Sequence, residues 1–227
     1  MYISAKKPAG ASKQPARAPG FSARAASGFK PSARKMADAR LALADAQSHF
    51  ASPSLFSPPK AINAKEAEGA LASCFHAISA WRSLSGSLAK GTPEWLEAQL
   101  ALGSLYSMRG MICKRNYEEA IVAGRKTGIW VLRSGEAFEA ALACFKAAAA
   151  LGLPGVNEQA LKQTLKDVHE EIFWSYYTLA VLSVKKGRAP LPFPRLEKLA
   201  DLPGKAGGYA CKATYHGAMS SALGLEI

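Results

Sequence analysis

The sequence predicts an all-α fold in which antiparallel helical hairpins stack into a short solenoid behind an extended N-terminal arm. Three observations carry this prediction. Apolar residues recur at helical spacing from residue 36 onward, clusters of glycine and proline separate the helical segments, and no segment shows the strict alternation of a half-buried strand. The chain has 227 residues, 49% hydrophobic and 20% charged, a balance typical of a folded domain.

Residues 1–35 are predicted to form a basic arm that is disordered alone or extended on a partner. They hold eight lysines and arginines and no acidic residue, so they contribute +8 to the net charge of +12. Four prolines and few aliphatic residues leave too little apolar area to offset the entropy lost on ordering. The segment Gly20–Arg24 recurs as Gly28–Arg34 with a two-residue insertion, which is either chance similarity in a biased composition or a tandem linear motif. The expected partner-binding residues of the arm are Lys6, Lys7, Lys13, Arg17, Phe21, Arg24, Phe29, Lys30, Arg34 and Lys35.

Two helices and a linker are predicted between the arm and residue 90. Met36–Phe50 is rich in alanine and leucine and is the first predicted helix. A proline-rich linker then reaches residue 61, so residues 36–61 connect the arm to a helical domain of residues 62–227. The first helix of that domain, Ile62–Lys90, carries Leu71, Phe75, Ile78, Trp81 and Arg82 near helical spacing.

A strong helix start follows at Thr92-Pro93-Glu94. Threonine can cap free backbone amides, proline suits the first turn, and glutamate favours the positive end of the helix dipole. This third helix is expected to run to about Lys114. Its stretch Ala98–Tyr106 is apolar on nearly all sides, which predicts a place in the middle of the helical array.

Residues 117–186 are predicted to form two further helical regions. The first covers residues 117–151 and contains three glycines that are candidate breaks. The second begins at the predicted cap Asn157 and reaches Lys186. The candidate breaks are Gly124, Gly128 and Gly135, and the apolar stripe of the second region consists of Leu161, Leu165, Val168, Ile172, Tyr176 and Leu179.

The C-terminal part is predicted to be less regular. Prolines at three alternate positions in residues 190–194 predict a stiff extended connector. Weaker helices are expected from Leu196 and from Ala206. These assignments leave no predicted sheet.

No group of residues predicts a catalytic or metal site. The four cysteines are far apart in apolar, helix-like contexts, which predicts buried reduced thiols. The four histidines are scattered, and each is expected at the surface or at the edge of the core. Gly204–Gly208 is similar to a phosphate loop but follows no strand, so a loop or a helix start is expected there. We therefore expect no enzyme activity, no cofactor and no bound metal. The residues in question are Cys74, Cys113, Cys144, Cys211, His49, His76, His169 and His216.

Small residues beside aromatic ones predict close helix packing. Within Leu102–Gly110, Gly103 lets a neighbouring helix approach and Tyr106 fills the space one turn later. This segment resembles the first helix of a tetratricopeptide repeat, and Asn116–Ala120 resembles the start of its second helix after a short insertion. Gly135–Ala148 has the same character, with small alanines between bulky phenylalanines. The predicted packing residues are Leu102, Gly103, Leu105, Tyr106, Phe138, Phe145, Phe173 and Trp174.

Three blocks also resemble the Alix/Bro family of banana-shaped helical domains. They are the Leu-Gly-x-Leu-Tyr-Ser-like segment Leu102–Ser107, the alanine- and phenylalanine-rich segment Ala141–Ala149, and the acid–aromatic cluster Glu171–Trp174. The resemblance covers about residues 70–220, whereas the family domain is longer on its N-terminal side. It implies a helical architecture and a protein-binding role, and no residue of the family's partner groove is assigned.

These observations lead to the hypothesis of a non-catalytic structural or adaptor protein. Its helical module would bind other proteins, and its arm would anchor it to a large acidic assembly. A microtubule is the favoured assembly, because its lattice repeats and its surface is acidic; the family resemblance implies an endosomal sorting coat. The alternative is a nucleic-acid-associated protein, ribosome-associated or RNA-binding, that uses the same arm.

The composition also bears on location. The longest strongly apolar uncharged run, Ile172–Val184, is shorter than the roughly 20 residues that cross a bilayer, so no integral membrane association is expected. We expect a cytoplasmic protein, with the cytoskeleton or a cilium as favoured sites. The acid-free arm, rich in arginine and serine, leaves the mitochondrial matrix open, although its prolines oppose the amphipathic helix of a presequence.

Overall fold

A computed structural model describes residues 33–50, 64–122, 128–151, 157–183 and 205–225, and these residues form six α-helices. No strand occurs among them, which confirms the all-α prediction. The helices are α1 (Ala33–Phe50), α3 (Ala64–Ser87), α4 (Pro93–Val122), α5 (Gly128–Ala149), α6 (Glu158–Ser183) and α8 (Lys205–Leu225).

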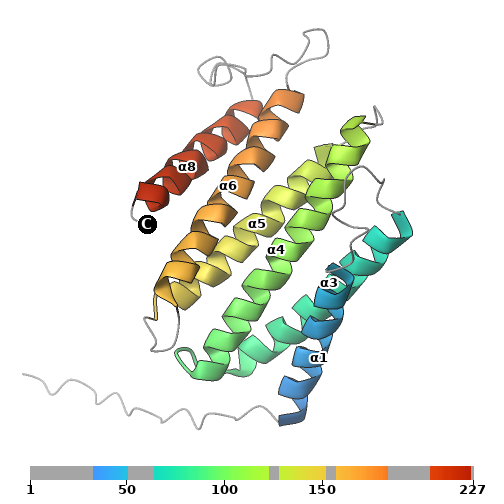
Figure 1. The fold of residues 1–227 in the computed structure, drawn as a ribbon, viewed down its shortest axis with the longest axis vertical. Helices are drawn as coiled ribbons and strands as arrows, with labels where there is room; N and C mark the ends of the chain where they lie inside the picture. The colour runs from blue at the N-terminus through green and yellow to red at the C-terminus, as the bar shows by residue number, and fades with distance from the viewer. Residues whose placement is uncertain (1–32, 51–63, 123–127, 152–156, 184–204, 226–227) are drawn as a thin grey trace, which may run out of the picture.

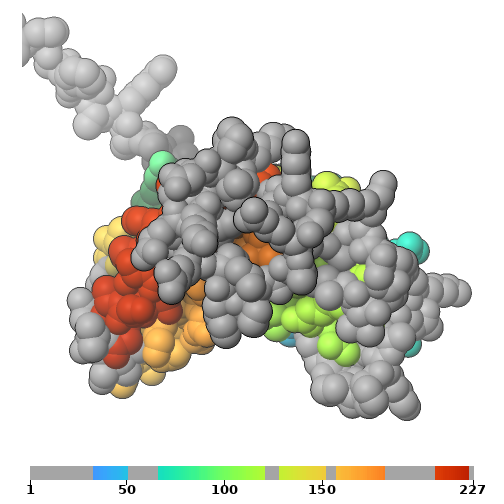
Figure 2. Space-filling model, turned by 90° about the horizontal axis from the view of Figure 1, so that it is seen from above, coloured from blue at the N-terminus to red at the C-terminus, as the bar shows by residue number. Residues whose placement is uncertain are grey.

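The helices pack mainly on their neighbours in chain order. The principal interfaces join α1 to α3, α3 to α4, α4 to α5, α5 to α6 and α6 to α8 (Figure 1). Helix α1 also reaches α4, where the Arg40 guanidinium donates two hydrogen bonds of 2.7 Å to the Glu97 carboxylate. Helix α8 lies at one flank of the array beside α6 (Figure 2). The middle of the array is therefore α4 and α5.

Two predicted helix starts are confirmed in atomic detail. The backbone N–H of Trp95 donates to Thr92 Oγ1 at 3.2 Å, and Pro93 is the first residue of α4. At the start of α6, the backbone N–H of Ala160 donates to Asn157 Oδ1 at 3.0 Å. Each cap satisfies one amide that has no partner within its own helix.

The structure corrects the predicted end of the third helix. Helix α4 continues without a break past Lys114 to Val122, so Asn116–Ala120 does not begin a second repeat helix. Tyr117 and Ala120 extend the buried face of α4. Lys114, Arg115 and Asn116 are partly buried in the same helix, and Lys114 pairs with the Glu171 carboxylate of α6.

One further boundary and two residue placements differ from the prediction. Helix α1 begins at Ala33, so Arg34 and Lys35 belong to its exposed first turn and not to the arm. Gly135 does not interrupt α5; it is buried where the Tyr176 side chain packs against it. Phe75 is 67% exposed, because alanine and cysteine residues take the buried face of α3 beside Ile78 and Trp81. The predicted arm residues 1–32, the linker at 51–63, Gly124, the prolines of 190–194 and the helix start at Leu196 lie outside the described residues.

Helices α4 and α5 interlock at two glycines. A Cβ atom at Gly103 would lie 2.6 Å from Cε1 of Phe145, and one at Gly110 would lie 2.8 Å from Cε2 of Phe138. Such distances are too short for any real side chain, so each phenylalanine ring occupies the space of a missing methyl group. The Ser134 hydroxyl adds a hydrogen bond of 3.0 Å to the backbone carbonyl of Gly110. The predicted close approach at Gly103 is confirmed.

The central position of α4 is also confirmed. Ala98, Ala101, Leu102 and Leu105 are buried between α3 and α5, as is Tyr106. Both phenylalanines of α5 are buried as predicted. The core of the described residues is therefore built around α4.

Gly103→Ala should lower stability, because the new methyl group would press against the packed Phe145 ring. Overpacking costs about 1–3 kcal/mol, more than the roughly 1 kcal/mol by which alanine exceeds glycine in a helix. The matched control is Gly69→Ala in α3, where a new Cβ would meet nothing within 4 Å. That change should raise the melting temperature. A higher melting temperature for Gly103→Ala would contradict the interlock.

Leu105→Ala should cost about 2–5 kcal/mol of unfolding free energy, because it leaves a cavity at a side chain that is 0% exposed. Leu41→Ala is the control, since Leu41 is 71% exposed and its loss should change stability by less than about 0.5 kcal/mol. Urea denaturation of both variants measures the difference. Equal effects of the two substitutions would show that α4 is not central.

Candidate functional site

The outer side of α6 carries a cluster of three aromatic residues: Phe173, Trp174 and Tyr177. The Phe173 and Trp174 ring centroids lie 4.9 Å apart in an edge arrangement, and Tyr177 stacks on Phe173 at 5.7 Å. Trp174 also meets Tyr177 edge-on at 5.9 Å. We call these three residues the α6 aromatic cluster. Their mutual contacts fix the orientation of the rings.

The cluster is partly open to solvent. Trp174 was expected within the packing, but it is 40% exposed and its described ring contacts are with the other two members of the cluster. Phe173 is half-buried and lies against Gly217 of α8, where a Cβ would be 3.1 Å from its ring. The cluster therefore has one side anchored on α8 and one side available for a partner.

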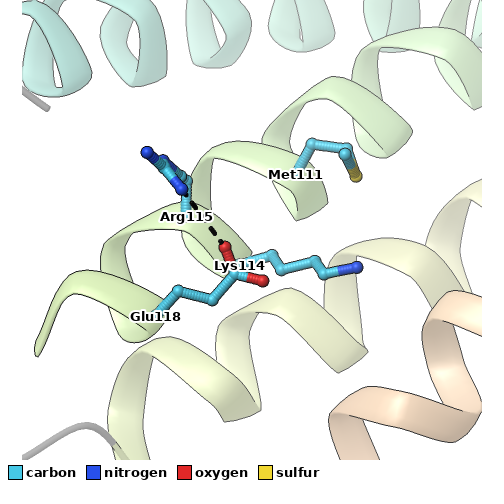
Figure 3. Close-up of a pocket in the computed structure, with 4 residues that line it drawn as sticks. All are labelled: Met111, Lys114, Arg115 and Glu118. Carbon is cyan, nitrogen blue, oxygen red and sulfur yellow. Dashed lines mark ion pairs between the residues drawn. The ribbon is translucent and has the colours of Figure 1, made fainter. Parts of the chain in front are cut away.

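A second feature is a recess of about 190 Å³ on α4, lined by Met111, Lys114, Arg115 and Glu118 (Figure 3). Its cations are already paired. Lys114 Nζ donates to both carboxylate oxygens of Glu171 on α6, at 2.8 and 2.7 Å. Arg115 faces Glu118 at 3.7 Å on the same helix. Because these charges neutralise one another, the recess does not form an anion site.

The histidines give the clearest departure from the prediction. His49 and His76 are exposed, as expected, but His169 and His216 are buried and touch each other. Their Nδ1 atoms lie 2.8 Å apart across the α6–α8 interface. The signal in the sequence is that His216 follows the buried Ala210 and Ala213 at helical spacing, and so lies on the same face of α8.

A polar network lies next to the histidine pair. Lys212 Nζ of α8 donates to Glu139 Oε1 of α5 at 2.7 Å and to the Tyr176 hydroxyl at 3.1 Å. The ammonium group also lies 4.5 Å from the centre of the Tyr176 ring. Burial alone would lower the pKa of Lys212, but the hydrogen bonds to Glu139 and Tyr176 raise it. The lysine therefore stays charged and joins α8 to two other helices.

The cysteines follow the prediction in part. All four are free thiols, and Cys74 and Cys113 are buried, but Cys144 is half-buried and Cys211 is exposed. Burial, the largest effect, raises the pKa of Cys74 and of Cys113 to about 11. Among the described residues, no three histidine, cysteine or acidic side chains gather where they could hold a metal ion.

Comparison of the chain with models of protein families, with curated proteins and with solved structures finds no match. The resemblances to tetratricopeptide repeats and to the Alix/Bro family therefore remain predictions. Within the part of the chain that the structure describes, no helix is both long and apolar enough to cross a membrane.

Thiol labelling at neutral pH should modify Cys211 quickly and leave Cys74 and Cys113 unmodified. Only the thiolate is nucleophilic, and a buried thiol with a pKa of about 11 is almost wholly protonated as well as inaccessible. Mass spectrometry of peptides after maleimide treatment measures the modified fraction at each site, with Cys211→Ser as the control that removes the fast reaction. Fast labelling of Cys74 in the folded protein would contradict its placement.

Proposed function

We propose that the chain is a non-catalytic structural or adaptor protein. Its helical body binds a protein partner through the α6 aromatic cluster, and its basic arm attaches the body to a large acidic assembly. The exposed Trp174, held by Phe173 and Tyr177, is the observation that carries the proposal. Tryptophan and tyrosine supply much of the binding energy at protein interfaces, since they offer large contact areas at little cost in side-chain entropy.

The distribution of charge supports separate roles for the arm and the helical body. The described residues hold 15 lysines and arginines and 14 acidic residues, so they are almost neutral. Residues 1–32 add six cations without an acid. The arm would therefore attract an acidic polymer. The nearly neutral helical body would contribute contact area without strong electrostatic attraction.

A microtubule remains the favoured polymer, with a cytoskeletal or ciliary location in the cytoplasm. An endosomal sorting coat is the option implied by the Alix/Bro resemblance. The chain-order packing of the helices is compatible with a short solenoid of hairpins, in the manner of tetratricopeptide or Bro-type domains. An RNA partner, or a place in the mitochondrial matrix, is the alternative that the same basic arm allows.

A pelleting assay with stabilised microtubules tests the attachment. The full chain should pellet with microtubules at about 0.15 M salt, and binding should weaken as salt rises. Replacing the six basic residues of 1–32 by glutamine should reduce the affinity at least tenfold, while Trp174→Ala should leave it unchanged. Binding to RNA at this salt, with none to microtubules, would reverse the proposal.

A photo-crosslinking amino acid tests the cluster separately. Placed at Trp174 in the intact native assembly, it should form one discrete crosslinked product with a partner protein. The same amino acid at Glu136, an exposed residue of α5, is the control and should give no such product. Absence of a product at position 174, or the same product at both positions, would contradict the proposed role of the cluster.

A further inference from the structure

The buried contact between His169 and His216 restricts how many protons the two rings can hold. Their Nδ1 atoms are 2.8 Å apart, so one nitrogen carries the shared hydrogen and the other accepts it. His169 Nε2 is also buried and has no hydrogen-bond partner among the described residues. If His169 Nδ1–H is the donor, Nε2 of that ring bears no hydrogen, and the buried atom is a bare acceptor. The opposite arrangement would bury an unpaired N–H, which costs more.

Any added proton breaks this arrangement. Two neutral rings carry two N–H groups, one between the Nδ1 atoms and one on His216 Nε2. Only one hydrogen fits between the two Nδ1 atoms. With a third N–H in the pair, both Nε2 atoms must therefore carry a hydrogen, whichever ring donates between the Nδ1 atoms. His169 would then bury an Nε2–H without an acceptor, and the ring that donates between the Nδ1 atoms would carry a buried positive charge. A fourth N–H would place a hydrogen on each Nδ1 atom, so that two donors would face each other across 2.8 Å.

The charged groups around the pair oppose protonation overall. On α5, Glu139 favours a charged His216, but Lys146 disfavours charge on both histidines. On α8, Lys212 acts against a charged His216 and already engages Glu139. The remaining ring against the pair is Tyr215 of α8, whose centroid lies 5.0 Å from that of His216 and 6.4 Å from that of His169.

Helix α8 packs along α6 over an extensive interface, within which the His169–His216 hydrogen bond is a fully buried polar contact. Tyr209 stacks on Tyr176 at 5.9 Å, Lys212 binds Glu139, and Gly217 meets Phe173. Its other buried residues are alanines, which bury little area. A helix of 21 residues rich in glycine and alanine, with no acidic residue in its first turn and no basic residue in its last turn, gains most of its stability from docking.

We propose that the His169–His216 pair is a proton-sensitive latch, which holds α8 on α6 while both rings are neutral and releases α8 when the pair gains a proton. Release uncovers the inner side of the α6 aromatic cluster at Phe173 and the ring of Tyr176. The latch is independent of the partner proposed for that cluster, since it acts within this chain alone.

The direction of the pH dependence follows from linkage. Burial, and then the proximity of His216 and Lys146, lowers the pKa of His169 to about 4, and burial lowers the pKa of His216. A released histidine titrates near 6.5. Docking is therefore at full strength above pH 6.5, weakens as pH falls below 6.5, and continues to weaken until about pH 4. For His169 alone, the ratio of released to docked α8 should rise about 30-fold between pH 7.5 and 5.0.

Hydrogen exchange of the full chain tests the latch. After correction for the intrinsic pH dependence of exchange, amides of α8 should lose at least about 30-fold in protection between pH 7.5 and 5.0. The double variant His169→Gln/His216→Gln should show no such change. The matched control, His49→Gln/His76→Gln, keeps the pair and should behave as the unmodified protein. Retention of the pH effect in the first variant, or a loss spread evenly over all helices, would overturn the proposal.

A second measurement on the unmodified protein covers the case in which the glutamine variant fails to dock α8. The ring signals of His169, followed by NMR, should remain those of a neutral imidazole down to about pH 5 while α8 stays protected. A ring that titrates at pH 6.5 or above in the docked state would overturn the latch, whatever the variant does.

Discussion

The interlock of α4 and α5 at Gly103 and Gly110 is the constraint on which the rest of the structure depends. The two glycines are seven residues apart on α4, and the two phenylalanines that fill their space, Phe145 and Phe138, are seven residues apart on α5. Both contacts must form together. A shift of α5 along α4 by one helical turn would move both phenylalanine rings away from their glycines, so the two contacts fix the register of the antiparallel pair. Helix α4 then presents its other side to α3, and α5 presents its other side to α6.

The packing of a glycine against an aromatic ring recurs along the array of helices. A Cβ at Gly135 of α5 would lie 3.3 Å from the ring of Tyr176 on α6, and one at Gly217 of α8 would lie 3.1 Å from the ring of Phe173. Each successive pair of helices from α4 to α8 thus places a glycine against an aromatic ring. The contact is tightest in the α4–α5 pair, and α8, the last helix of the described array, packs mainly on α6.

Local sequence patterns predicted the helices, the caps at Thr92 and Asn157, and the close approach at Gly103, since each depends on residues near in the chain. They could not show which phenylalanine meets which glycine, because that requires the register between helices. The histidine pair was missed for a similar reason, because its members are 47 residues apart and each alone was expected at the surface or at the edge of the core. Phe173 and Trp174 were predicted as packing residues, and the exposure of Trp174 was missed, since helical spacing does not reveal which side a neighbour leaves open.

A double-mutant cycle on Gly103 and Phe145 tests the central interlock most directly. Unfolding free energies are needed for Gly103→Ala, Phe145→Leu and the combination. If the ring occupies the space of the missing methyl group, the smaller leucine makes room for alanine. The double variant should then be more stable than the sum of the single effects predicts, by about 0.5–3 kcal/mol. Additive effects would contradict the account, because they would mean that Gly103 and the Phe145 ring do not touch.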